Sequence, residues 1–171
     1  EALDDIIDRK LSGVLPIFNC NQYGQADRVS AQQRAPVLKA KLAAAGFTVI
    51  GFDVAPQRMA ECASAGGVPA SCPRAVAEQA DIIVSVLPSV AALDAVVSAA
   101  DGMLAAGRAG QILVEASTFA LADKQRVRDL AAPRLTVLDC PLSGTGAQAV
   151  IKALLVYASG DSASIERCKP L

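Results

Sequence analysis

The chain has 171 residues, of which 53% are hydrophobic and 19% are charged, a balance that excludes intrinsic disorder as its main state. Its 16 Lys and Arg residues against 17 Asp and Glu residues leave a net charge of -1, without the basic field that gathers nucleic acid or an acidic membrane surface. The chain has no histidine, which excludes a Ser-His-Asp or Cys-His relay and any imidazole metal site. We therefore expect neither nucleic acid nor a membrane as a partner.

The cysteines argue against both a disulfide framework and a thiolate metal site. They are odd in number and include no C-x-x-C pair, so we expect most of them to be small buried side chains in a reducing compartment. The most apolar run, 82–93, is shorter than the ~18–20 apolar residues of a membrane-spanning helix. The expected location is the cytoplasm. The cysteines are Cys20, Cys62, Cys72, Cys140 and Cys168.

From Ala35 onward, helical segments alternate with segments rich in β-branched residues. Helices of this length between strands imply parallel pairing through right-handed crossovers. The pattern predicts an α/β fold with a doubly wound, mostly parallel sheet. The expected strands are 47–54, 81–88, 111–118, 135–142 and a further one at 154–160. The expected helices are 35–45, 56–65, 73–80, one that carries Leu93, Val96 and Val97 on one side, and 121–131.

Residues 1–34 differ in character from the rest of the chain. The segment GVLPIF can supply a first strand, although Pro16 would confine it to a sheet edge or a strand start. The change at Ala35 predicts a division into an atypical N-terminal segment, 1–34, and an α/β domain, 35–171. A frameshift, a fusion joint and a misassigned start each account for such a change.

Ligands of a doubly wound sheet bind beyond the carboxyl ends of its strands. Asp53 stands at the first such end, where a carboxylate either accepts hydrogen bonds from ribose hydroxyls or caps the helix that starts at Pro56. The next end is Leu87-Pro88-Ser89, in which proline stops the strand and Ser89 caps the following helix.

Two later strand ends are rich in hydroxyl groups. The segment Glu115–Thr118 places them at the edge of the sheet, where they either meet a ligand or cap a helix. In the segment 139–149, two glycines stand between hydroxyl residues, so the backbone can approach a ligand closely. A tight turn between two strands is the alternative interpretation of that segment.

In order and spacing, the segments FTVIGFD, ADIIVSVLPS, VEAST, LDCPLSGTGAQA and YASGD resemble the β-hydroxyacid dehydrogenases. That family includes 3-hydroxyisobutyrate dehydrogenase, and its first domain resembles that of 6-phosphogluconate dehydrogenase. The resemblance covers the chain from about Ala35 and implies a Rossmann-like domain that binds NAD or NADP. It also implies oxidation of a small 3-hydroxy acid by hydride transfer to nicotinamide. A truncated, non-catalytic module and an interaction protein built on the same sheet are the alternatives.

The resemblance also implies roles for the residues that bind the cofactor. Asp53 would face the adenosine ribose and favour NAD, Leu87 and Pro88 would line the cofactor cleft, and Thr118 would lie near the nicotinamide ribose.

The family's glycine-rich turn has no counterpart where it is expected. Counting back ~20 residues from Asp53 places its glycines at Val29, Ala31 and Arg34, none of which is glycine. A Cβ at these positions would obstruct the pyrophosphate.

By the same resemblance, Ser143, Gly144 and Thr145 would bind the substrate, with Ser143 as the candidate for a role in catalysis. The family's catalytic lysine lies in a helical domain that would follow the end of this sequence, and neither Lys152 nor Lys169 matches its context. We therefore expect the cofactor domain alone, without turnover of its own. We also expect exposed apolar surface where that domain would pack, with a homo-oligomer as a further expectation.

Overall fold

The structure is a computed structural model, and it describes residues 14–18, 47–132, 134–143 and 155–169. The helix expected over 35–45 lies outside the described residues, as do the positions counted for the glycine-rich turn.

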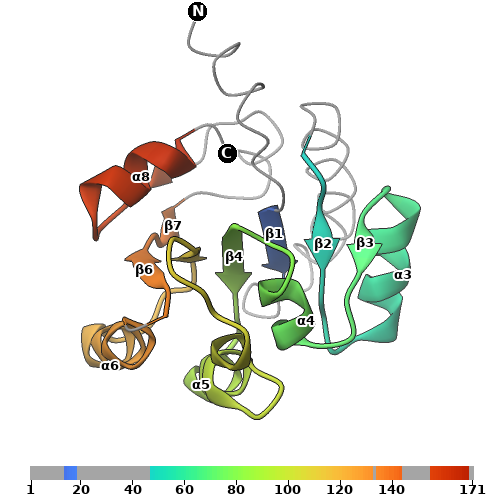
Figure 1. Cartoon of the computed structure of the whole chain (residues 1–171), viewed down its shortest axis with the longest axis horizontal. Coiled ribbons are helices and arrows are strands. Elements are labelled where there is room, and N and C mark those ends of the chain that lie inside the picture. The colour runs from blue at the N-terminus through green and yellow to red at the C-terminus, as the bar shows by residue number, and fades with distance from the viewer. Residues whose placement is uncertain (1–13, 19–46, 133, 144–154, 170–171) are drawn as a thin grey trace, which may run out of the picture.

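A parallel sheet forms the centre of the molecule (Figure 1). Four hydrogen-bonded strands run in the order β1-β4-β5-β6: β1 (Val14–Phe18), β4 (Ile82–Val86), β5 (Ile112–Glu115) and β6 (Thr136–Asp139). A separate parallel pair joins β2 (Ile50–Gly51) to β3 (Val68–Pro69), and β2 lies beside β1. The spatial order is therefore β3-β2-β1-β4-β5-β6, which is the order of a doubly wound dinucleotide-binding sheet.

Strand β1 comes from the segment that the sequence sets apart as 1–34. It hydrogen-bonds to β4, with Pro16 opposite Val84. Among the described strands, β1 ends the four-stranded ladder, a position that tolerates the missing N–H of proline. In space, however, β1 lies between β4 and β2 (Figure 1). Strand β1 is therefore at the edge of the hydrogen-bonded ladder, as expected, but not at the edge of the spatial order of the strands. The domain division at Ala35 stays a prediction.

The described helices include four that correspond to ranges expected from the sequence and one, at Ser162–Cys168, that was not predicted. They are α3 (Pro56–Ser64), α4 (Pro73–Ala77), α5 (Val90–Ser98), α6 (Leu121–Ala131) and α8 (Ser162–Cys168), with a 3-10 turn, η1 (Met103–Ala105). The predicted cap of α5 is present, because the Ala92 N–H donates to Ser89 Oγ at 3.1 Å. The strands are shorter than expected, and β3 was not predicted.

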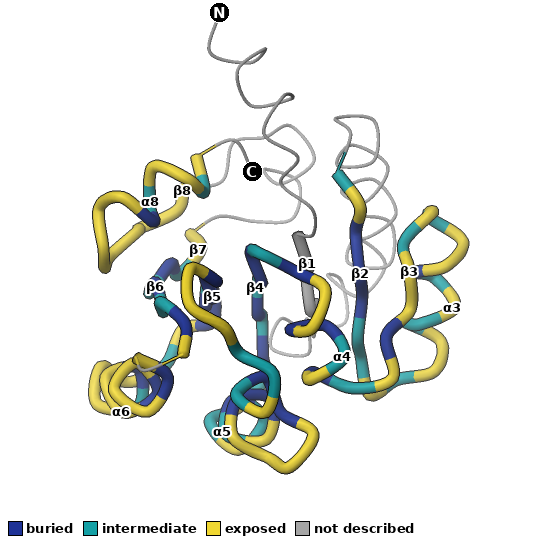
Figure 2. Tube along the Cα trace, in the orientation of Figure 1, coloured by how far each residue is buried: buried dark blue, intermediate teal, exposed yellow. Residues whose placement is uncertain are grey.

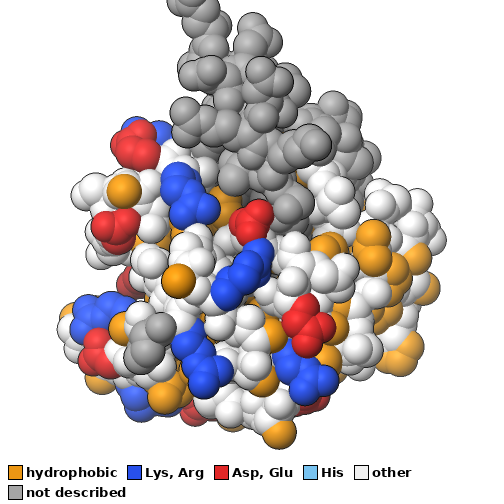
Figure 3. All heavy atoms as spheres, viewed as in Figure 1, with side chains coloured by type: hydrophobic (Ala, Val, Ile, Leu, Met, Phe, Trp, Pro, Cys, Tyr) orange, Lys and Arg blue, Asp and Glu red, His pale blue; other side chains and the backbone are white. Residues whose placement is uncertain are grey.

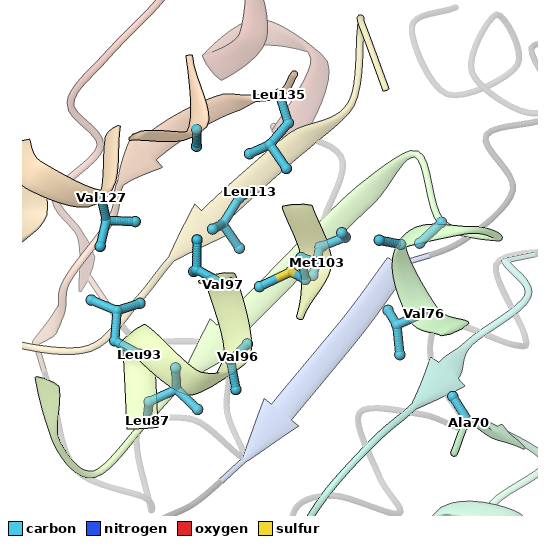
Figure 4. Packing of buried hydrophobic residues seen from close by; sticks show 14 of the residues in the cluster. Ala70, Val76, Leu87, Leu93, Val96, Val97, Met103, Leu113, Val127 and Leu135 are labelled. Atoms are coloured by element: carbon cyan, nitrogen blue, oxygen red, sulfur yellow. The ribbon is translucent and has the colours of Figure 1, made fainter. Parts of the chain in front are cut away.

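Described helices pack on both faces of the sheet, and the strands between them are largely buried (Figure 2). On one face, Leu93 and Val97 of α5 and Val127 of α6 pack with Leu113 of β5 (Figure 4). On the other face, α8 contributes Ile165 and Cys168, which pack against Ile82, Ile112 and Leu138. This second contact places α8 on that face of the sheet, next to β6.

A short antiparallel ribbon extends the chain beyond β6. Strand β7 (Leu142–Ser143) pairs antiparallel with β8 (Leu155–Val156), so the strand expected over 154–160 forms but does not extend the parallel sheet. The strands are therefore mostly, and not wholly, parallel, as the sequence predicts. The ribbon exposes large apolar side chains, Leu142, Leu155, Val156 and Tyr157, with exposed fractions from 38% to 62%.

Basic and acidic side chains are interspersed over the described part of the face in Figure 3. None of the helices in the described ranges is long and apolar enough to cross a membrane.

Candidate functional site

A row of polar residues crosses β4, β5 and β6 near their carboxyl ends. Two positions earlier on the same face, Ile83, Leu113 and Val137 are aligned across β4, β5 and β6 and pack in the core. The next residues in that register are Ser85, Glu115 and Asp139. Ser85 and Glu115 are completely buried, whereas Asp139 is half-buried, so the row runs from the interior under β4 and β5 toward the surface at β6.

Helix α6 supplies a buried cation to this row. The Lys124 side chain is 6% exposed and forms ion pairs with the carboxylates of Glu115 and Asp139, the second at 2.8 Å between Nζ and Oδ1. Its Nζ also donates to the carbonyl oxygens of Glu115, at 3.3 Å, and Ser117, at 2.7 Å. The ring centroid of Phe119 lies 5.8 Å from the same nitrogen. A buried ammonium is tolerated because each side of it meets an anion, a carbonyl or an aromatic ring.

Ser117 links this cluster to the neighbouring strand end. Its N–H donates to Glu115 Oε1 at 3.1 Å, and its Oγ accepts a hydrogen bond of 2.7 Å from the N–H of Leu87. Its carbonyl is the one held by Lys124. All three polar groups of Ser117 are therefore engaged, and the carboxyl ends of β4 and β5 are fixed to each other.

Three of the predicted cofactor residues lie at the hydrogen bond between Leu87 and Ser117: Leu87 itself, Pro88 and Thr118. The side chain of Leu87 is buried in the core beside α5 (Figure 4), so this residue offers its backbone and not its side chain to the edge of the sheet. Pro88 is half-buried. Thr118, directly after Ser117, is exposed at the carboxyl end of β5.

Asp53 is half-buried and follows β2 closely. Its Oδ1 accepts a hydrogen bond of 2.8 Å from the N–H of Ala55, the residue before α3. This bond supports the turn that leads into α3, which is the helix-capping interpretation of Asp53. An ordered carboxylate at the carboxyl end of β2 also has the position and chemistry that ribose hydroxyls require.

The predicted substrate residues lie beyond β6. Ser143 is exposed in β7, whereas Gly144 and Thr145 lie outside the described residues. The predicted glycine positions, 29, 31 and 34, lie outside them as well. Strand β1 ends at Phe18. The sequence that follows it, NCNQYG, contains one glycine, Gly24.

Sequence reasoning missed Lys124, Glu115 and Asp139 as a group. A lysine in the first turn of a helix is normally interpreted as a solvated charge, and each acid alone marks only a strand end. The signal that could have found them is the pairing of β5 with β6. Two neighbouring strands that both end in an acid at the same register need a cation nearby to neutralise the two carboxylates.

Four of the cysteines lie in the described part of the chain. Cys62, Cys72, Cys140 and Cys168 are free, with Cys62 and Cys140 buried. Burial raises the pKa of the Cys140 thiol, and burial together with the neighbouring Cys140 raises the pKa of Cys168 to about 11. Within the described ranges, the Cys, Asp and Glu side chains form no group suited to a metal ion.

Comparison with known proteins agrees with this geometry. Residues 37–171 match the model of the NAD binding domain of 6-phosphogluconate dehydrogenase. A probable 3-hydroxyisobutyrate dehydrogenase of Mycobacterium bovis is 33% identical over 136 residues, which are 78% of this chain and 45% of that protein. An NAD-dependent L-serine dehydrogenase of Pseudomonas aeruginosa is 30% identical over 128 residues, 74% of this chain and 43% of that protein.

Among solved structures, the 3-hydroxyisobutyrate dehydrogenase of Mycobacterium tuberculosis, determined with L-serine, superposes with a TM-score of 0.73 and 28% identity. The superposition covers 94% of this chain and 50% of that one. The chain thus spans about half the length of the relatives it matches.

The strand order and the family match define a Rossmann-like domain for NAD or NADP. Within that class, the chain belongs to the β-hydroxyacid dehydrogenase family and covers its NAD-binding domain.

Proposed function

We propose that this chain is the cofactor-binding part of an oxidoreductase that acts on a small 3-hydroxy acid with NAD as the preferred cofactor. The observation that carries the proposal is the shared edge of the sheet at which Asp53, Pro88 and Thr118 stand, one at the carboxyl end of each of β2, β4 and β5. In a sheet with this strand order, a dinucleotide lies across the carboxyl edge, where the order reverses between β1 and β4. The nicotinamide ring, when bound, supplies the hydride acceptor or donor.

The residues present fit such a cofactor. Asp53 would accept hydrogen bonds from the adenosine ribose and repel a 2′-phosphate, which favours NADH over NADPH. Exposed Thr118 would offer its hydroxyl to the nicotinamide ribose, and Ser143, Gly144 and Thr145 would bind the substrate carboxylate or hydroxyl. The substrate class rests on the names of the relatives, and assembly into a homo-oligomer stays a prediction.

Calorimetric titration of the full chain with NADH and, separately, NADPH tests the proposal. We expect tighter binding of NADH. In Asp53→Asn, the amide oxygen can still accept the Ala55 N–H while the negative charge is lost, so the entry to α3 should persist. That variant should reduce the preference for NADH by roughly tenfold, or about 1.4 kcal/mol.

The matched control is Asp94→Asn, which removes a carboxylate from α5 that pairs with Arg126 at the surface. It should leave both affinities unchanged. A folded chain that gives no heat with either cofactor at millimolar concentration would overturn the proposal in favour of a non-catalytic module.

A further inference from the structure

Lys124 stands where helix electrostatics disfavour a cation. It is the fourth residue of α6, and the N-terminal turn of a helix carries partial positive charge from its unpaired N–H groups. The side chain is also buried, which removes the hydration of the ammonium. Two unfavourable effects therefore act on one residue, and a specific arrangement of anions has to offset them.

That arrangement reaches three strands of the sheet. The carboxylates of Glu115 and Asp139 come from adjacent strands in direct register, and Lys124 lies between them. Through the carbonyl of Ser117, whose Oγ accepts from Leu87, the same ammonium is connected to the end of β4. One side chain from α6 thus contacts the ends of β5 and β6 directly and is linked through Ser117 to the end of β4.

These three ends form one half of a dinucleotide site. A doubly wound sheet binds one mononucleotide with each half, and β4, β5 and β6 are the half that follows the reversal of strand order. Pro88 and Thr118 directly follow Leu87 and Ser117, which this network binds, and Ser143 lies four residues after Asp139. Asp53 belongs to the other half, where its N–H donates to Met59 Sδ at 3.0 Å and its Oδ1 accepts from the N–H of Ala55 at 2.8 Å.

We propose that Lys124 is a positioning residue for the nicotinamide half of the cofactor site. It holds the ends of β4, β5 and β6 at the spacing that this half of the cofactor requires, and it leaves the adenosine half unaffected. The inference rests on the proposed function, because it needs a chain that binds NADH.

The test separates the two halves of the cofactor. Lys124→Met alone would leave the buried Glu115 carboxylate without its cation, so it is expected to destabilise the fold. The double variant Glu115→Gln, Lys124→Met removes the two buried charges and leaves the carboxylate of Asp139, whose side chain is 34% exposed, to the solvent. The amide oxygen introduced at position 115 can still accept the Ser117 N–H. Arg126→Met is the matched control, because it removes an exposed cation from the same helix.

Calorimetry with NADH and with AMP is performed on the full chain, the double variant and the control. We expect the double variant to bind NADH at least roughly tenfold more weakly, a difference of about 1.4 kcal/mol, and AMP with unchanged affinity. The Leu87 amide should also exchange with solvent faster in the double variant, as measured by NMR. Arg126→Met should change none of these values.

The outcomes distinguish the two proposals. If the full chain binds NADH and the double variant binds it equally well, the positioning role of Lys124 is wrong and the proposed function stands. Equal losses for NADH and AMP would also overturn it, since they would reveal a general effect on the fold. If the full chain binds no NADH, the proposed function fails, and the role of Lys124 fails with it.

Discussion

The backbone N–H of Leu87 donates a hydrogen bond of 2.7 Å to the hydroxyl oxygen of Ser117, a residue 30 positions later in the chain. Both residues are buried, so no bulk water can replace this bond if it is lost. The bond joins two strand ends directly below Pro88 and Thr118, which are predicted to contact the cofactor. A small hydroxyl side chain thus determines the spacing of two loops.

Two buried serines on this edge are expected to respond differently to the same substitution. Ser117→Ala leaves the buried N–H of Leu87 without its acceptor, which should lower the free energy of unfolding by about 1–3 kcal/mol. Ser85 Oγ is also buried but has no hydrogen-bond partner among the residues that the structure describes. Ser85→Ala should therefore be neutral or raise stability by up to about 1 kcal/mol.

Urea unfolding of the two variants, followed by circular dichroism, measures both values. Each variant serves as the control for the other, because both remove one hydroxyl from a buried serine. Equal destabilisation by the two substitutions would contradict the assigned role of Ser117.

Stability should fall in alkaline solution because of Cys168. Its pKa rises from 9.0 to about 11 in the folded chain, chiefly through burial and then through the neighbouring Cys140. Between about pH 9 and pH 11 the folded thiol keeps a proton that the unfolded thiol loses, so the free energy of unfolding decreases as the pH rises. Below pH 9 both states keep the proton, and this contribution is constant.

The expected measurement is a series of urea unfolding curves from about pH 8 to about pH 11, which spans the interval between the two pKa values. Cys168→Ala should give a smaller decrease over this interval than the original chain. Cys72→Ala, which removes a different half-buried thiol, is the control. A decrease of the same size in Cys168→Ala would show that other groups cause it.

Two glycines differ in what surrounds them, and alanine substitution should reveal the difference. Gly160 has φ +138, and a Cβ there would approach Leu138 Cδ2 to 2.7 Å. Gly66 has φ +79, but a Cβ would meet nothing within 4 Å. Gly66→Ala should cost about 1 kcal/mol from backbone strain alone, and Gly160→Ala about 2–3 kcal/mol because it adds a clash.

Thermal unfolding of both variants measures this difference. Gly160 directly follows Ser159, whose backbone exchanges hydrogen bonds of 2.8 and 2.9 Å with Asp139. If Gly160→Ala were as mild as Gly66→Ala, the contact of this turn with Leu138 would be less tight than described.

The sequence predicted the helices better than the strands, for physical reasons. Helix α6 occupies the predicted range, 121–131, because its apolar spacing is a local property of the chain. Strand β3 consists of Val68 and Pro69, both exposed, and exists only because β2 lies beside it. The direction of β8 likewise depends on its pairing with β7, which no local pattern encodes.

The candidate site likewise combines residues that a local sequence pattern indicates with residues that only the strand register brings together. Asp53, Pro88 and Thr118 could be named as candidates from the sequence because each follows a recognisable strand, and their roles stay predictions. The Lys124 cluster was missed because it depends on the register between β5 and β6 and on the face that α6 turns toward them. Leu87 was predicted to line the cofactor cleft, and the sequence did not indicate that its side chain packs in the core or that its amide is bound to Ser117.

The central position of β1 has a consequence for the order in which the molecule folds. Strands β4, β5 and β6 pair with near neighbours in the chain, Ile82 with Ile112 and Ile112 with Thr136, but Val14 must pair with Ile82 across more than a third of the sequence. Contacts between distant segments require the closure of large loops and form slowly. The two halves of the sheet are therefore expected to form early, and the insertion of β1 to complete the molecule late. During synthesis β1 leaves the ribosome before its partner strand β4, so it stays unpaired until β4 has been synthesised.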